Sequence, residues 1–410
     1  MEEKGLKIKS ISVKSYKCLD EVEIDCKRND TSIYQWTVLL GNNNTGKTSL
    51  LKAIANLRPI KLKYLKPEDY VKEDDFFVPA AHHHFEFALN ELAESSQISC
   101  VIRDVREGCE WNWRYETEYL FGNEDPKMND FHIYAYGVSR YPTKTSLSEF
   151  ACGDCDSLFY PYKYLVDIEE WLMQLDYAAK KEKKAAAHRL TKIKELICGN
   201  LFPEIDDFKF ETSDTLHNSV LFRTKDGWFP YTQLGYGYQS MLSWVIDLCK
   251  RMFERYPDSE NPLSESAIVL VDEIDLHLHP KWQRDIISFL SKAFPNVQFI
   301  VTTHSPLVIQ SMDNVNLYVL HREGNKVKVE HSSVSNFRGW TVEEILRDTM
   351  RLESDIHSNE YQQSIQKFDE GLDQNDKIKV IEAYKELCEI LHPENPVRRL
   401  LELQLPNLDN

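Results

Sequence analysis

Long apolar runs are missing from this sequence. Its longest apolar stretches are the size of a strand, such as residues 268–271 and 299–301, and its N-terminus is charged. A membrane helix needs about 20 apolar residues, and a secretory signal needs an apolar region near the N-terminus. These absences argue against a membrane protein and predict a cytoplasmic one without a membrane partner. With 410 residues, 42% of them hydrophobic, the chain is large enough for two or three domains.

Clustered metal ligands are also scarce. The nine cysteines are scattered, and the one close pair, Cys152 and Cys155, lacks a second pair at zinc-finger spacing. The histidine run at residues 82–84 has no spaced carboxylate or cysteine beside it, which favours a polar loop. The sequence therefore predicts no structural zinc site.

Basic residues are in the minority, and the formal net charge is −17. Because neutralisation of phosphates supplies most non-specific affinity for DNA, this charge argues against a protein whose whole surface binds DNA. One basic cluster, residues 180–192, lies in an Ala-rich run that we predict to be helical. We interpret it as a solvated helix face, with a local nucleic-acid contact as the alternative.

The sequence does contain a phosphate-binding loop pattern, in which two glycines precede Lys and a hydroxyl residue. A predicted buried strand at residues 35–40 comes before it and a predicted helix at 49–56 follows, which is the context the motif requires. The nucleotide-binding residues predicted from this pattern are Gly41, Asn42, Asn43, Asn44, Thr45, Gly46, Lys47, Thr48 and Ser49.

Each residue type in this loop has a task. Gly41 and Gly46 allow the chain to turn tightly around an anion, and backbone amides at the helix start bind phosphate. Lys47 would reach the β- and γ-phosphates, and the Thr48 hydroxyl would bind Mg²⁺. The predicted cofactors are ATP and Mg²⁺, and we assign no other metal.

Two further predicted strands end in residues suited to the same chemistry. The apolar strand at 268–271 is followed by Asp272, a predicted Mg²⁺ ligand, and Glu273, a predicted base for the attacking water. The strand at 297–301 ends in Thr302, Thr303 and His304. Open parallel sheets bind ligands at the carboxyl ends of their strands, so we expect His304 to contact the γ-phosphate or the water.

A glycine-containing turn opens a predicted helix upstream of the Asp272 strand. It includes Leu234, Gly235, Gly237 and Gln239. The N-terminus of a helix of this sort attracts anions.

Together these motifs resemble the ATP-binding-cassette class of ATPases, in the soluble branch that includes SMC, RecF and OLD-type proteins. The resemblance implies an α/β fold: a P-loop ATPase head with a mixed sheet, a parallel core and an antiparallel edge lobe. It also implies a head-to-head dimer or higher homo-oligomer, in which Leu234, Gly235, Gly237 and Gln239 of one head face the nucleotide of another. Asp275 would lie in the dimer-contact loop.

The resemblance divides the chain as follows: 1–60, 130–145 and 205–315 form the ATPase head; 61–129 is an insertion on its first lobe; 146–204 is a short helical insertion in place of a coiled-coil arm; and 316–410 is a hairpin with a helical C-terminal region for assembly or partner binding.

Two departures from the pattern of that class stand out. Gly235 occupies the place where the signature usually has Ser, which removes a hydroxyl from the γ-phosphate and predicts slow hydrolysis. The segment at residues 135–140, Ala-Tyr-Gly-Val-Ser-Arg, stands where a Gln loop is expected. It resembles a segment common in antiphage ATPases.

This segment, the Asp272 box and the tail near Trp340 are similar to the PtuA family of ATPases in Septu defence systems and to relatives in retrons. Membership would imply a sensing or regulatory ATPase that controls a separate HNH nuclease of the PtuB type, with DNA contacted through the complex. The alternatives are a RecF- or SMC-like DNA-repair ATPase, an ATPase with a Toprim effector as in PARIS systems, and a nuclease in its own right. The tail offers no clustered carboxylates or histidines for cleavage, which argues against the last.

Overall fold

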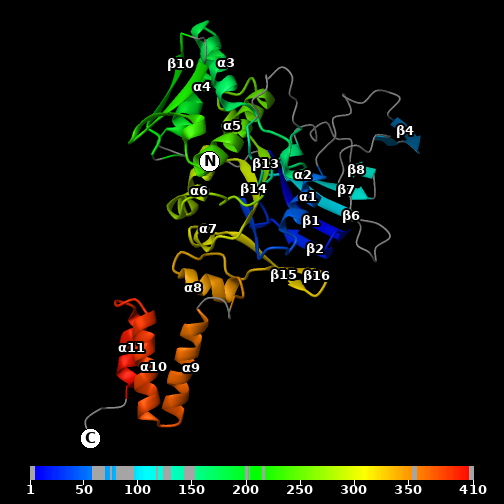
Figure 1. The fold of residues 1–410 in the computed structure, drawn as a ribbon. Coiled ribbons are helices and arrows are strands. Elements are labelled where there is room, and N and C mark those ends of the chain that lie inside the picture. The colour runs from blue at the N-terminus through cyan, green and yellow to red at the C-terminus, as the bar shows by residue number, and fades with distance from the viewer. Residues whose placement is uncertain are drawn as a thin grey trace. The chain divides into compact units, whose positions relative to one another are not determined.

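The structure is a computed structural model that describes residues 5–57, 70–73, 76–79, 97–116, 119–122, 131–142, 153–198, 202, 204–214, 218–352 and 358–405. The chain forms two compact units, Met1–Val342 and Glu343–Asn410 (Figure 1). Among the helices of the described residues, none has the length and apolar character needed to cross a membrane.

The first unit is built on one mixed sheet of 11 strands, in the order β8-β7-β6-β1-β2-β16-β15-β3-β14-β13-β9. Its strands are β1 (Leu6–Tyr16), β2 (Leu19–Asp25), β3 (Trp36–Gly41), β6 (Gln97–Asp104), β7 (Glu110–Glu116), β8 (Tyr119–Gly122), β9 (Ile133–Tyr136), β13 (Ala267–Val271), β14 (Val297–Thr303), β15 (Asn316–Glu323) and β16 (Lys326–His331).

Five neighbouring strands form a parallel core. β15, β3, β14, β13 and β9 pair in parallel along the sheet. Every residue of β3, β13 and β14 is buried, as expected for apolar runs without alternation in a sheet covered on both faces. Because parallel strands end at the same edge, the carboxyl ends of these three strands bring Gly41, Asp272 and His304 together.

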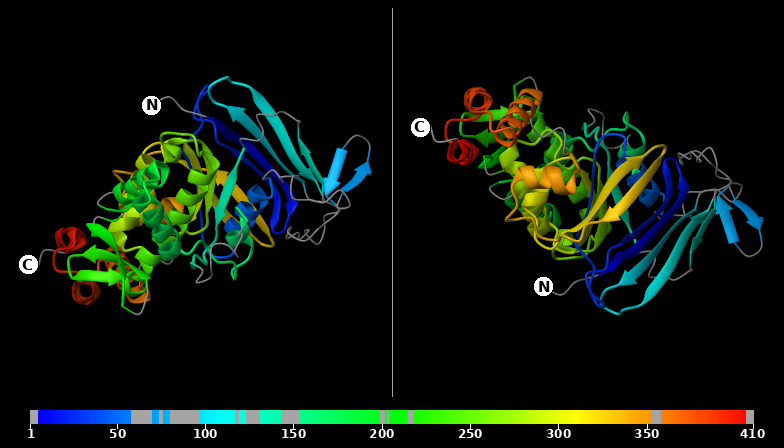
Figure 2. Two further views of the ribbon diagram at one scale, coloured as in Figure 1. Left: turned by 90° about the horizontal axis from the view of Figure 1, so that it is seen from above. Right: turned by 90° about the horizontal axis from the view of Figure 1, so that it is seen from below.

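The other side of the sheet is an antiparallel lobe. β1 pairs with β2 and β6, and β6 to β8 continue outward, so that the blue and cyan strands lie together in Figure 2. The predicted α/β class, with its parallel core and antiparallel lobe, is confirmed by this topology. Within the segment 61–129, which we predicted to be an insertion on the first lobe, β6 pairs along β1 and extends the sheet of this lobe. Strands β4 (Tyr70–Glu73) and β5 (Phe76–Pro79) form a separate hairpin.

The side chain of Gln298 joins the lobe to the core. Its amide donates to the Ile8 carbonyl and accepts from the Ile8 N–H, both at 2.8 Å. Gln298 lies near the start of β14, at the opposite end of that strand from His304.

Helices cover this sheet and lead into the site. α1 packs between β1 and the strands β13 and β14, whereas the long α5 contacts both α3 and α4. The helices of the unit that are four residues or longer are α1 (Lys47–Ala55), α2 (Asp156–Phe159), α3 (Ile168–Lys180), α4 (Lys184–Ile197), α5 (Tyr236–Arg255), α6 (Pro280–Ala293) and α7 (Pro306–Gln310).

The helical insertion is a hairpin of α3 and α4 beside a small sheet of β10 (Asp207–Thr212), β11 (Asn218–Thr224) and β12 (Gly227–Pro230). The Ala- and Lys-rich run that we predicted as continuous helix breaks between Lys180 and Lys184, where Glu182 has φ of 59°. Helix propensity favours this run, but residues 180–184 are all charged and exposed, so they add no apolar side chain to the packing of the two helices. Packing of the apolar faces therefore decides where the chain turns.

The predicted hairpin near residue 316 belongs to the central sheet and not with the helical tail, because β15 pairs with β3. The second unit contains α9 (Asn359–Asp373), α10 (Lys377–Ile390) and α11 (Pro396–Gln404). These helices enclose a small core of their own, made of Phe368, Val380, Ala383, Leu387 and Leu401. A short α8 (Val342–Glu344) and a π-helical turn (Ile345–Thr349) precede them.

Candidate functional site

The loop between β3 and α1 has the backbone of a phosphate cradle. Gly46 has φ of 83° and Asn44 has φ of 62°, so the chain reverses tightly before α1 begins. A Cβ on Gly41 would collide with the Leu320 carbonyl and would lie 2.6 Å from Thr45 Oγ1. The Thr45 hydroxyl closes the turn by donating to the Asn42 carbonyl at 2.8 Å. The fold thus fits the anion that the sequence predicts, since the first amides of α1 have no partner within the helix.

Lys47 lies at the mouth of this loop. Its ammonium group donates to the carbonyls of Gly41 and Asn42, each at 2.8 Å. Burial lowers the pKa of Lys47 to about 8, and the carboxylates of Asp272 and Glu273 oppose this shift. A polyphosphate would supply the negative partner that favours the charged amine.

The hydroxyl of Thr48 and the carboxylate of Asp272 meet although they are far apart in the sequence. Thr48 Oγ1 donates to Asp272 Oδ2 at 2.7 Å. The second oxygen, Asp272 Oδ1, accepts from the Thr302 hydroxyl at 2.7 Å. Hydroxyl and carboxylate oxygens are the ligands that Mg²⁺ prefers, so this pair fits a magnesium ion bound beside a triphosphate. Thr302 was not predicted as a site residue.

Glu273 points its carboxylate toward His304. Glu273 Oε1 and His304 Nε2 are 3.9 Å apart, and both side chains are about one-third exposed. Glu273 has φ of 48°, an uncommon value for this residue type, and its N–H donates to Thr302 Oγ1 at 2.7 Å. Burial, with the positive charge of Lys47, lowers the pKa of His304, so the ring is neutral at pH 7. A neutral imidazole beside a carboxylate can orient a water molecule.

Asp275 is anchored close to the same edge. Its Oδ1 accepts from the Thr303 hydroxyl at 2.5 Å, and Thr303 Oγ1 also accepts from the Ser305 N–H at 3.0 Å. The structure thus brings Asp272, Glu273 and Asp275 together with the end of β14.

The predicted signature segment begins α5. A Cβ on Gly237 would lie 2.6 Å from the His277 carbonyl, so a glycine there lets the helix approach the loop after Asp272. Gly235 has no such constraint, because its Cβ would be 3.7 Å from the nearest side chain and its φ is −59°. Leu234 is buried, and the Gln239 amide donates to the Leu234 carbonyl at 2.6 Å. These last two residues hold the start of α5 in shape.

Arg140 is the most informative residue that the predictions missed. It is 3% exposed, and its guanidinium donates to the carbonyls of Asp272, Glu273 and Gly137. Burial lowers the pKa of Arg140 to about 10, so it keeps its charge at pH 7. The unusual segment at residues 135–140 was the signal in the sequence that could have identified it.

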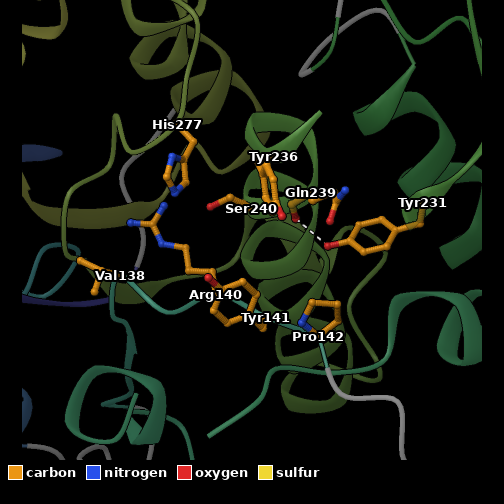
Figure 3. Close-up of a pocket in the computed structure, with 9 residues that line it drawn as sticks. All are labelled: Val138, Arg140, Tyr141, Pro142, Tyr231, Tyr236, Gln239, Ser240 and His277. Carbon is orange, nitrogen blue, oxygen red and sulfur yellow. Dashed lines mark hydrogen bonds between the residues drawn. The ribbon is translucent and has the colours of Figure 1, made fainter. Parts of the chain in front are cut away.

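Arg140 also lines a small pocket at the start of α5. The pocket has a volume of about 40 Å³, and Figure 3 shows the guanidinium pointing between His277 and Ser240. Its walls are Val138, Arg140, Tyr141, Pro142, Tyr231, Tyr236, Gln239, Ser240 and His277.

The cysteine and histidine features lie apart from the site or outside the described residues. The Cys155 thiol is buried and donates to the Ile133 carbonyl at 3.3 Å. Cys152 and residues 82–84 are not among the described residues. In the ranges that the structure describes, no group of three or more His, Cys, Asp or Glu side chains is arranged to hold a metal ion.

Two family descriptions match parts of the chain. The family described as "AAA domain, putative AbiEii toxin, Type IV TA system" matches residues 168–310, which include the signature, Asp272 and His304. The family described as "AAA ATPase domain" matches residues 6–93, which include the phosphate loop.

Individual relatives extend this likeness. Septu protein PtuA of Bacillus thuringiensis is 26% identical over 378 residues, which cover 90% of this chain and 91% of that protein. A second Septu protein PtuA, from Bacillus mycoides, is 26% identical over 347 residues, or 83% of this chain and 44% of that protein. Retron Ec83 probable ATPase of Escherichia coli is 40% identical over 126 residues, or 31% of this chain and 23% of that protein.

These findings confirm the predicted resemblance to Septu and retron ATPases. Among solved structures, the SMC head domain from Thermotoga maritima aligns with a TM-score of 0.43 at 15% identity, covering 80% of this chain and 100% of that chain. RecF, a recombination mediator protein, aligns with a TM-score of 0.41 at 12% identity, covering 80% of this chain and 100% of that chain. Scores this low carry no inference about function.

Proposed function

We propose that this chain binds Mg²⁺ and ATP between β3, β13 and β14 and hydrolyses the nucleotide as a regulatory ATPase of antiphage defence. The observation that carries the proposal is the hydrogen bond of 2.7 Å between Thr48 and Asp272, because it joins the phosphate loop to the carboxylate edge. Magnesium, when bound, would neutralise charge on the phosphates and orient them.

The residues of the site have separate roles in this proposal. Lys47 and the first amides of α1 bind the phosphates, and Thr48 and Asp272 hold the metal ion. Glu273 accepts a proton from the attacking water, and His304, 3.9 Å away, orients that water or the γ-phosphate.

A second copy of the chain completes the site. Leu234, Gly235, Gly237 and Gln239 lie at the N-terminus of α5, whose dipole favours an anion. In the proposed head-to-head dimer this segment and Asp275 face the nucleotide bound to the partner copy, and hydrolysis is slow because Gly235 brings no hydroxyl.

The proposed biological role follows from similarity to Septu protein PtuA over nine-tenths of the chain. The ATPase would assemble as an oligomer and control a separate HNH nuclease, with DNA contacted through the complex. A RecF- or SMC-like repair ATPase and an ATPase with a Toprim effector are the competing proposals. An HNH gene beside this one would support the first, and a Toprim gene would support the last.

Two substitutions test the ATPase site. Glu273→Gln should keep ATP binding while hydrolysis slows by about 10²–10⁴-fold, because the amide cannot accept the proton. Lys47→Ala should weaken ATP binding itself. Binding measured by calorimetry and phosphate release measured in Mg²⁺ distinguish the two effects. Parental hydrolysis rates in both variants would show that the site is assigned wrongly.

The role of the partner has its own test. The purified chain with phage or plasmid DNA and Mg²⁺ should leave the DNA intact, and cleavage should require the added nuclease. The proposal would be overturned in favour of an intrinsic nuclease if the chain alone cleaved DNA and if replacing a carboxylate residue of the tail with alanine abolished that cleavage.

A further inference from the structure

We propose that residues 136–140 form a positioning element of the ATPase site. Arg140 fixes the main chain that carries Asp272 and Glu273, and Tyr136 ties this main chain to α5. The inference rests on the proposed function, since it concerns the carboxylates to which that function assigns the metal ion and the water.

Arg140 holds three main-chain carbonyls at once. Its Nη2 donates to Asp272 and to Glu273, the latter at 2.8 Å, and its Nε donates to Gly137 at 2.9 Å. A guanidinium is planar and its donors have fixed directions, so these bonds set the orientation of one peptide unit relative to another. Lysine offers a single charged group and cannot reproduce this geometry.

The backbone of Glu273 is held on both sides. Its N–H donates to Thr302 Oγ1 at 2.7 Å, and its carbonyl accepts from Arg140. Glu273 adopts φ of 48°, a conformation that persists where the surroundings determine it. Because the backbone sets the direction of the side chain, Arg140 and Thr302 together aim the Glu273 carboxylate toward His304.

The other end of the element binds the signature helix. The Tyr136 hydroxyl donates to Asp247 Oδ2 in α5 at 2.9 Å, and Arg251 Nε donates to the same oxygen at 2.5 Å. The Tyr136 carbonyl accepts from the Asp272 N–H at 2.8 Å. A Cβ on Gly137 would collide with the Ser157 carbonyl, so glycine is required at the bend. This accounts for Tyr, Gly and Arg at their spacing.

The pocket of Figure 3 makes a second connection between Arg140 and α5. Arg140 Nη1 is buried, and no hydrogen-bond partner is found for it within the described residues. The Arg140 side chain lines the same pocket as Ser240 of α5 and His277, next to the place where Gly237 meets the His277 carbonyl. A shift of the signature helix against a partner copy would therefore reach the main chain of Asp272 and Glu273 through Arg140.

Arg140→Lys and Arg140→Gln test the positioning role. Because the phosphate loop is untouched, we expect the Kd for ATP to stay within about threefold of the parent while kcat falls by about 10–100-fold. Arg189→Gln is the matched control: the Arg189 guanidinium donates to the Phe253 carbonyl at 3.3 Å, away from the carboxylates, and its loss should leave kcat unchanged.

These variants are measured in the full chain, with kcat from phosphate release and Kd from calorimetry. Parental kcat in both Arg140 variants overturns the proposal, as does a loss of kcat matched by an equal loss of ATP affinity. Glu273→Gln is assayed alongside them. If it too hydrolyses ATP at the parental rate, the proposed function has failed and not the positioning role alone.

Tyr136→Phe tests the link to α5 and does not depend on the folding of an Arg140 variant. It removes the hydroxyl and keeps the ring, so we expect kcat to fall about three- to tenfold at unchanged Kd. In the double variant with Arg140→Lys, the combined loss should be smaller than the product of the single losses, since both act on one main chain. Parental kcat in Tyr136→Phe, or a full product of losses in the double variant, overturns the link.

Discussion

The phosphate loop and the signature segment both contain two glycines, but the structure constrains them differently. At the phosphate loop, Gly41 lies against the Leu320 carbonyl and Gly46 needs a positive φ. At the signature, Gly237 is required by the His277 carbonyl, whereas Gly235 has space for a side chain and ordinary dihedral angles. The loop is thus set by its own fold. At the signature, packing does not require glycine at position 235, so the residue there can change the activity without disturbing the fold.

Among the changes that test this comparison, Gly41→Ala should cause the largest loss of ATP affinity. The added methyl would push against the Leu320 carbonyl and Thr45, which should cost about 1–3 kcal/mol of stability and displace the loop. We expect ATP affinity to fall by more than about tenfold, measured by calorimetry, with unfolding followed in urea. Gly339→Ala is the control, because nothing lies within 4 Å of its Cβ position. Parental affinity in Gly41→Ala would show that the loop tolerates more than its packing implies.

Raising the pH above about 8 should weaken ATP binding, with an effect intermediate between those of the two glycine substitutions. Burial lowers the pKa of Lys47 in the free protein to about 8, so below this pH the amine is charged and ready for phosphate. Bound phosphate raises that pKa, so binding takes up a proton above about pH 8. Affinity should then weaken by up to about tenfold per pH unit.

Calorimetry in buffers of different ionisation enthalpy would detect this proton uptake directly. Lys47→Arg should lose the dependence, since arginine stays charged throughout this range. The same slope in Lys47→Arg would assign the titration to another group.

Gly235→Ser should have the smallest effect, and it concerns the unconstrained half of the comparison. The side chain fits, and Ser is a favourable N-cap for α5, so stability should change by only a few tenths of a kcal/mol. Restoring the hydroxyl near the partner's γ-phosphate should raise the hydrolysis rate by about two- to tenfold. Gly235→Ala adds the same Cβ without the oxygen and serves as the control. Equal rates in the two variants would mean that this position does not act on the nucleotide.

The elements that can be predicted from the sequence are those set by patterns in neighbouring residues. The strand, loop and helix around Gly41 follow from short-range pattern, and the buried strand before Asp272 follows from its apolar run. That both end at one edge follows from their parallel direction.

The parts that could not be predicted depend on contacts across the chain. Arg140 acts on carbonyls more than 130 residues away in the sequence, and no local pattern shows which backbone a guanidinium will meet. The break at Glu182 was missed for a similar reason, because burial on α3 and α4 outweighs the local preference for helix.

The backbones of the two lobes of the sheet pair with each other over a short stretch. β2 and β16 pair only at Leu19 and Val327 among the described residues, and Gly46 lies on this seam, where a Cβ would be 2.9 Å from Cys18 Sγ. Side chains make further connections at the other ends of these strands, where the Asp25 carbonyl accepts from the Asn316 amide and the Tyr318 hydroxyl and where Gln298 binds Ile8. Relative motion of the lobes would thus pivot at these side-chain contacts and separate the sheet at Leu19 and Val327, next to Gly46. A nucleotide bound in the phosphate loop would hold β2 and β16 together at this point. The Val327 amide donates to the Cys18 carbonyl, so its hydrogen exchange should slow when the nucleotide binds.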